Sequence, residues 1–176
     1  RCTYSVEPPG PAWPPEKIES YLRGWNETEI ALTAAHEAYP GHHVQAWWSL
    51  RERSPLRTAL WSGTFVEGWA VYATSLFVGQ GYGGERNDRY LFADLRGWMR
   101  VAANAILDVR LQGGDMTDEE ALRFMVEEGF QEPAQAERKL VRAKLDSTQL
   151  SQYFIGTSEL RALEAEARAR GAFDRR

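Results

Sequence analysis

Apolar residues recur every three to four positions through most of the chain, and this period is typical of amphipathic helices. The clearest example is residues 85–112, where one apolar stripe runs from Leu91 to Ile106. Residues 64–79 form the most apolar segment, so we expect a central helix there. With helices flanking both, the pattern predicts a mostly α fold.

Two places carry the sequence signature of a capping box, in which a polar residue is followed three positions later by Glu. Asn26 with Glu29 predicts that a helix begins just after Asn26, and Thr117 with Glu120 predicts another after Thr117. A strongly charged last helix is expected over residues 158–170. The seven tryptophans are predicted to fill the helical core rather than to line a cleft.

The start of the chain follows a different pattern. Residues 1–15 hold five of the eight prolines, and residues 2–6 have β-prone side chains. We expect an extended lead-in over 1–15, with a short edge strand, followed by a single helical domain over 16–176.

Composition narrows the classes of protein that the chain can represent. Of 176 residues, 43% are hydrophobic and 26% are charged, which suits one globular domain. No apolar run approaches the roughly 20 residues of a membrane-spanning helix. The net charge is -4 and basic residues are interleaved with acidic ones, which argues against nucleic acid as a partner.

The lone cysteine and the first residue of the chain bear on disulfide bonds, metal sites and processing. Cys2 can form neither an internal disulfide nor a thiolate metal site with this chain alone. The chain begins at Arg1 without a signal pattern, which suggests a processed product or part of a longer polypeptide. The cellular location stays open, with the cytoplasm slightly favoured over export.

All three histidines lie between positions 36 and 43, in the order His36-Glu37-Ala38-Tyr39-Pro40-Gly41-His42-His43. Without Pro40-Gly41 this is His-Glu-x-x-His, the motif in which two imidazoles bind one zinc ion and Glu serves as base. On a straight helix, however, His42 lies about 240° around from His36, and His43 lies ~10 Å along the axis. Neither pair could bind one ion in that geometry.

The Pro40-Gly41 pair predicts a break in the helix, because proline removes a hydrogen bond and glycine tolerates conformations closed to other residues. Such a break could return His42 to a position beside His36. Glu67, on the apolar helix, is the best candidate for a third ligand, since a carboxylate there needs a partner. Glu37 would then accept a proton from the attacking water.

The same residues admit an interpretation without metal. The histidines could be ordinary helix-end residues, and Glu67 could pair with an arginine. A purely structural zinc site is the least favoured alternative, because such sites prefer Cys ligands.

The motif resembles a bacterial family called domain of unknown function eight-eight-five, which is regarded as zincin-like and related to Glu-zincin metallopeptidases. The resemblance covers the chain from about residue 30 onward. It rests on the following segments: 36–45, 65–72, 108–111, 114–121 and 149–156. It implies zinc on His36, His42 and Glu67, with Glu37 as base, and it favours His42 over His43.

The resemblance also suggests that the phenol of Tyr153 reaches the site and stabilises an oxyanion, although the sequence alone equally predicts a core tyrosine. His43 and Tyr72 are weaker candidates for that donor role. Asp108 interrupts an apolar face. It could orient an imidazole, or it could form a buried ion pair with a nearby arginine.

Together these features predict a zincin-like, zinc-dependent hydrolase, most plausibly a metallopeptidase acting on peptides or small amides. The alternative is a catalytically silent binding or scaffold module. The resemblance is to the C-terminal portion of longer family members, so part of the cleft could come from a missing N-terminal portion or from another chain.

Overall fold

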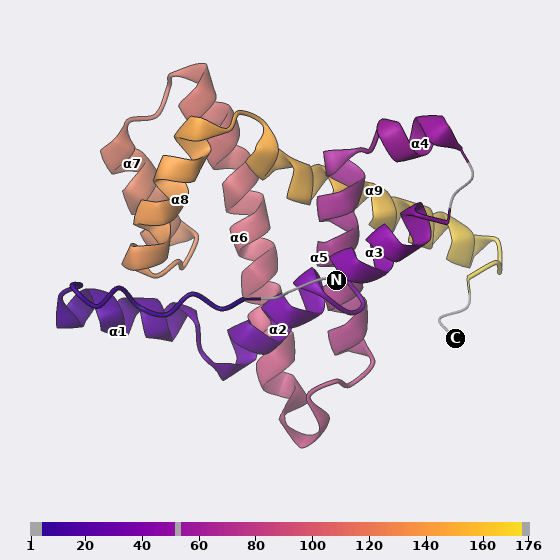
Figure 1. Cartoon of the computed structure of the whole chain (residues 1–176), viewed down its shortest axis with the longest axis horizontal. Coiled ribbons are helices and arrows are strands. Elements are labelled where there is room, and N and C mark those ends of the chain that lie inside the picture. The colour runs from indigo at the N-terminus through magenta and orange to yellow at the C-terminus, as the bar shows by residue number, and fades with distance from the viewer. Residues whose placement is uncertain (1–4, 52–53, 174–176) are drawn as a thin grey trace.

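The computed structural model describes residues 5–51 and 54–173, and these residues are mostly helical (Figure 1). The first helices in chain order are α1 (Pro15–Gly24), α2 (Glu27–Glu37), α3 (His42–Ser49), α4 (Pro55–Ala59) and α5 (Gly63–Gly79). A 3-10 turn (Gly84–Arg86) leads into the long α6 (Asn87–Gly113). The remaining helices are α7 (Asp118–Arg123), a π-helical turn (Phe124–Glu128), α8 (Pro133–Leu145) and α9 (Gln149–Ala169).

Helices α5, α6 and α9 form the centre of the structure, and α9 packs against both of the others. Helices α2 and α3 lie over α5. Helix α8 packs against α6, and both α1 and α7 pack against α8 (Figure 1). One apolar core joins α6, α7, α8 and the start of α9 around Leu107, Met125 and Leu150, all nearly inaccessible to solvent. A smaller core lies among α2, α5 and α6 around Leu32 and Val78.

The crossing of α5 and α9 depends on two glycines. A Cβ placed on Gly68 would lie 2.3 Å from the carbonyl carbon of Gly156. A Cβ on Gly156 would lie 1.9 Å from the carbonyl oxygen of Thr64. The two backbones are therefore nearly in contact, and the Thr157 hydroxyl donates a hydrogen bond to the carbonyl of Gly68 (3.3 Å).

The predicted helix starts differ in how they are built. Thr117 and Glu120 form the complete capping box, with both reciprocal hydrogen bonds present. Asn26 accepts hydrogen bonds from the backbone of Thr28 and Glu29, but the Glu29 side chain does not return to it. Glu29 is buried and instead binds two arginines of α6.

Several expectations about the fold need correction. No strand occurs among the described residues, and the expected edge strand falls largely on residues 1–4, which lie outside them. The last helix begins at Gln149 rather than near residue 158. Residues 149–157 belong to the same helix, α9, which packs against α5.

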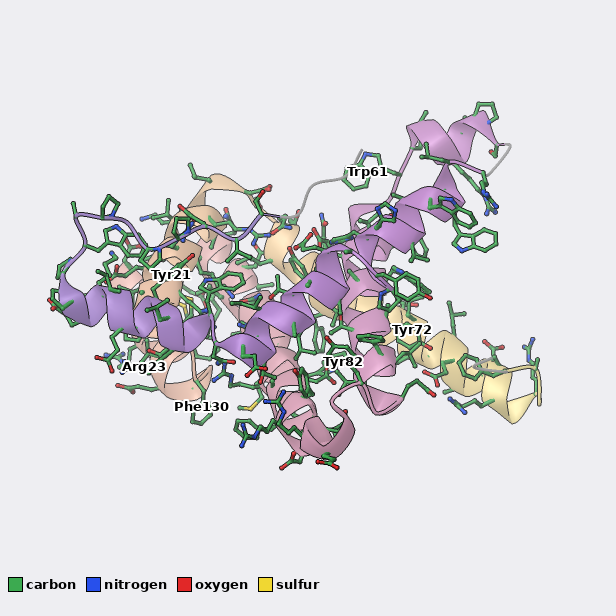
Figure 2. All side chains as sticks on the ribbon, turned by 60° about the horizontal axis from the view of Figure 1, so that its bottom comes forward. Tyr21, Arg23, Trp61, Tyr72, Tyr82 and Phe130 are labelled. Carbon is green, nitrogen blue, oxygen red and sulfur yellow. The ribbon has the colours of Figure 1, made fainter. Side chains whose placement is uncertain are left out.

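The tryptophans do not fill the core. None of the seven is buried, and Trp48 and Trp61 are 63% and 69% exposed. Figure 2 shows Trp61 pointing outward from the segment before α5. Trp48 belongs to α3, whose main neighbours among the described elements are α2 and α5, and Trp61 lies in the connection between α4 and α5. No helix in the described part of the chain is long and apolar enough to cross a membrane.

Candidate metal centre

The break predicted at Pro40-Gly41 is present, and it forms the framework of the site. Helix α2 ends at Glu37, and the Gly41 amide folds back to donate a hydrogen bond to the carbonyl of Ala35 (3.0 Å). The Tyr39–Pro40 peptide bond is cis. A Cβ on Gly41 would lie 1.7 Å from the carbonyl oxygen of His36, so only glycine fits this close approach.

This turn places His42, the first residue of α3, beside His36, near the end of α2. Their ring centroids are 4.8 Å apart, with the ring planes nearly perpendicular. The Trp69 indole, on α5, donates a hydrogen bond to the carbonyl of Pro40 (3.1 Å). The turn is thus fixed against the helix that carries Glu67.

Glu67 completes a group of three ligand-type side chains. Its Oε2 atom lies 3.5 Å from Nε2 of His42 and 3.9 Å from Nε2 of His36. One potential ligand atom from each residue lies within 4.8 Å of the others. The structure therefore brings together the three predicted ligands, whereas the adjacent His43 is exposed and not part of the group.

The geometry is close to that of a zinc site. Two ligands bound to tetrahedral zinc at about 2.0 to 2.2 Å lie roughly 3.3 to 3.6 Å apart. The 3.5 Å separation of Glu67 from His42 falls in this range, and the 3.9 Å separation of Glu67 from His36 is slightly longer, so His36 must move closer to bind the same ion. Two imidazoles and one carboxylate are also a donor set that catalytic zinc sites use.

The three groups shift one another's pKa. Burial, followed by the charge of His42, lowers the pKa of His36 to about 4. A hydrogen bond to Glu67 raises the pKa of His42, even though burial opposes it. Burial alone would raise the pKa of Glu67, but the hydrogen bond to His42 and the nearby imidazoles and Tyr153 lower it. The carboxylate is thus ionised and His36 is neutral at pH 7, as ligand roles require, whereas His42, whose pKa is raised, would have to release its proton to bind a metal.

Tyr153, on α9, lies at the same site. Its ring is stacked 6.5 Å from the ring of His36. The Tyr153 hydroxyl accepts hydrogen bonds from Arg142 (2.7 Å) and from Gln149 (3.0 Å), and Gln149 also donates to Glu67 (3.3 Å). Because both acceptor positions of the hydroxyl are occupied, its proton is left to point toward Glu67 and the site.

The other candidates lie elsewhere. Glu37 is exposed in the last turn of α2 and lines a cleft of about 1200 Å³ together with His42 and His43. The hydroxyl of Tyr72 donates to Glu164 of α9, away from His36, and Figure 2 shows Tyr72 beside that helix. Tyr72 is therefore not a donor at this site.

Asp108 has neither of the roles considered for it. It is only 2% exposed, and its carboxylate accepts hydrogen bonds from the backbone of Thr148 (3.1 Å) and from the backbone and hydroxyl of Ser151 (3.0 and 2.7 Å). It therefore caps the start of α9 from the neighbouring helix. This anchors the turn that carries Gln149 and Tyr153.

Three residues at the site were missed by the sequence analysis: Gln149, Arg142 and Lys139. Gln149 stands four positions before Tyr153, a helical spacing that places both side chains on one face. Arg142 and Lys139 are separated by three positions on α8, but nothing local distinguishes them from the other basic residues. Only the packing of α8 against α6 and α9 brings them to the site.

The fold and the site define a helical protein with a His-His-Glu constellation held by three different helices. Residues 3–176 match the family model described as "Bacterial protein of unknown function (DUF885)". The chain belongs to this family.

A solved structure from Shewanella oneidensis, described as "a putative lipoprotein of unknown function", is similar over 97% of this chain. The sequences are 35% identical and the TM-score is 0.79. The present chain spans 31% of the length of that protein. Comparison with curated proteins gave no match.

Proposed function

We propose that the chain forms the active site of a zinc-dependent hydrolase, a metallopeptidase that cleaves peptide or small amide bonds. The observation that carries the proposal is the convergence of His36, His42 and Glu67. Their potential ligand atoms lie within 4.8 Å of one another beside an open cleft. An irregular turn that excludes any residue but glycine at position 41 supports the same conclusion.

His36, His42 and Glu67 would hold the metal. A zinc ion in such a site lowers the pKa of a water molecule and polarises a carbonyl group. The Glu37 carboxylate, on the cleft side of α2, accepts the proton of the attacking water and transfers it to the leaving amine. The Tyr153 hydroxyl, held by Arg142 and Gln149, donates its proton in a hydrogen bond to the developing oxyanion.

The test combines metal analysis with a single substitution. Purified protein should contain close to one zinc per chain. Glu37→Gln should retain the zinc and lose at least about a hundredfold in hydrolysis of N-blocked peptides, because it removes the base without removing a ligand. Glu159→Gln, an equal change at an exposed position of α9, is the matched control and should leave activity unchanged.

The outcomes separate the proposal from its alternative. Zinc in both proteins, with hydrolysis by the wild type and the control alone, supports the hydrolase. Zinc without hydrolysis favours a catalytically silent module. Protein that excludes zinc, or hydrolysis that Glu37→Gln does not change, defeats the proposal.

A further inference from the structure

A group of basic side chains lies directly beside the candidate metal centre. Arg100 of α6 and Lys139 and Arg142 of α8, here called the cationic cluster, line both the 1200 Å³ cleft and a smaller adjoining cavity of about 280 Å³. Glu37 lines both cavities as well, and His36 and Tyr153 line the smaller one. The cluster and the proposed catalytic groups therefore share the same space.

The cluster carries more positive charge than its protein partners balance. In the described part of the chain, Arg100 pairs with one carboxylate, that of Glu29, and Glu29 is shared with Arg96. Lys139 donates to the neutral amide oxygen of Asn104 (2.8 Å), and Arg142 donates to the neutral groups of Gln149 and Tyr153. Within residues 5–51 and 54–173, neither Lys139 nor Arg142 forms an ion pair with a carboxylate.

Lys139 is the most informative member. Burial, followed by the charges of Arg100 and Arg142, lowers its pKa well below the usual value. A half-buried lysine without a carboxylate partner is unfavourable in a folded protein, and among the described residues its ammonium uses one of its three donors. An anion bound at the cluster would use the remaining donors and favour the charged form.

A second observation comes from another part of the same cleft. Gln131 is only 5% exposed, and neither its amide nitrogen nor its amide oxygen has a hydrogen-bond partner among the described residues. It lines the 1200 Å³ cleft together with Lys139 and Arg142. Unpaired buried amide groups of this kind are rare in folded proteins, so this amide needs a polar partner, which a water molecule or a polar ligand in the cleft can supply.

We propose that the cationic cluster binds the terminal carboxylate of the substrate, so that the enzyme removes residues from the C-terminal end of peptides or N-acylated amino acids. This inference rests on the proposed hydrolase function. The position of the cluster carries it: Arg142 contacts the hydroxyl of Tyr153, which itself lies against Glu67 and His36. An anion bound there is close to the bond that would be cleaved. The terminal carboxylate of a peptide meets this condition when the bond cleaved is the last one of the chain.

The first experiment measures binding without turnover. Zinc-loaded Glu37→Gln protein is titrated calorimetrically with N-acetyl-Ala-Ala and with the corresponding C-terminal amide, and the titrations are repeated without zinc. The acid should bind at least tenfold more tightly than the amide, because loss of a charge-assisted hydrogen bond costs roughly tenfold to a hundredfold in affinity. N-acetyl-Ala-Glu amide, which has only a side-chain carboxylate, should bind no better than the neutral amide.

The second experiment assigns the discrimination to the cluster. Lys139→Gln and Arg142→Gln, each in the Glu37→Gln background, should weaken acid binding about tenfold or more and should weaken it by a larger factor than they weaken amide binding. Lys144→Gln is the matched control: it lies on the same helix and removes the same charge, but it pairs with Asp118 away from both cavities. Arg142 is exposed, so Arg142→Gln keeps the test valid even where Lys139→Gln unfolds.

Equal binding of acid and amide overturns the inference, as does the absence of binding at millimolar concentration. So does a loss in Lys144→Gln that equals the losses in the two cluster variants. Preferred binding of N-acetyl-Ala-Glu amide also overturns it, since the cluster would then select a side-chain carboxylate instead of the carboxylate at the chain end. A protein that discriminates acid from amide but shows no hydrolysis as wild type refutes the hydrolase proposal and not the carboxylate site.

Discussion

The closest backbone approach at the site gives a quantitative prediction for Gly41→Ala. The added Cβ would lie 1.7 Å from the carbonyl oxygen of His36, whereas real Cβ contacts are essentially never shorter than 3.0 Å. The turn must therefore open by more than about 1 Å. Zinc–ligand distances tolerate changes of only about 0.2 Å, so His36 and His42 could no longer bind one ion together.

We expect Gly41→Ala to weaken zinc binding by at least a hundredfold, measured by competition with a chromophoric zinc indicator. The metal-free protein should lose about 1 to 3 kcal/mol in its free energy of unfolding, measured by urea denaturation. Gly79→Ala is the control, because a Cβ at that position, in the last turn of α5, meets no atom within 4 Å. A folded Gly41→Ala protein that binds zinc as tightly as the wild type would refute this account of the turn.

Three further predictions concern pH and buried carboxylates. In metal-free protein, His36 should lower the free energy of unfolding by about 2 kcal/mol from pH 7 to pH 5, and His42, whose pKa is raised, should offset part of this decrease. His36 takes up a proton near pH 6.5 when unfolded but only at about pH 4 when folded, so the unfolded state binds more protons in this window. His36→Gln should lack this decrease in urea titrations, and an unchanged slope would contradict the burial of a neutral imidazole. Asp108→Asn should lower stability by about 1 to 3 kcal/mol, because an amide cannot accept all three hydrogen bonds at the start of α9; thermal denaturation that matches the wild type would be inconsistent with the capping role. Glu29→Gln should cost about 3 kcal/mol in urea denaturation by leaving Arg96 and Arg100 without their shared carboxylate, and a change below about 1 kcal/mol would count against a structural ion pair.

The sequence predicted best what is determined within one helical turn. The Thr117 capping box and the break at Pro40-Gly41 both depend on residues fewer than six positions apart, and both are present. The apolar periodicity also located α5 and α6 to within a few residues. These features follow from local hydrogen bonding and side-chain spacing, which the chain order alone specifies.

Features that depend on the packing of distant helices were not predictable in the same way. Asp108 looked like a candidate for an ion pair because its sequence neighbours are basic, but its partners lie 40 and 43 positions away at the start of α9. The hydrophobicity of Trp48 and Trp61 predicted a place in the core, yet α3 and the connection between α4 and α5 leave both side chains exposed. Arg142 reaches Tyr153 only because α8 turns back toward α9.

The contact between Gly68 and Gly156 has a consequence for how the protein tolerates change. Glu67 is adjacent to one of these glycines, and Tyr153 lies one helical turn before the other. Because the backbones themselves meet there, the separation of α5 and α9 does not depend on the size of any side chain between them. The apolar residues that fill the two cores can therefore be exchanged during engineering or divergence while the distance between a metal ligand and the phenol stays fixed. The crossing is a fixed backbone contact, so substitutions that the core accepts need not change the geometry of the site.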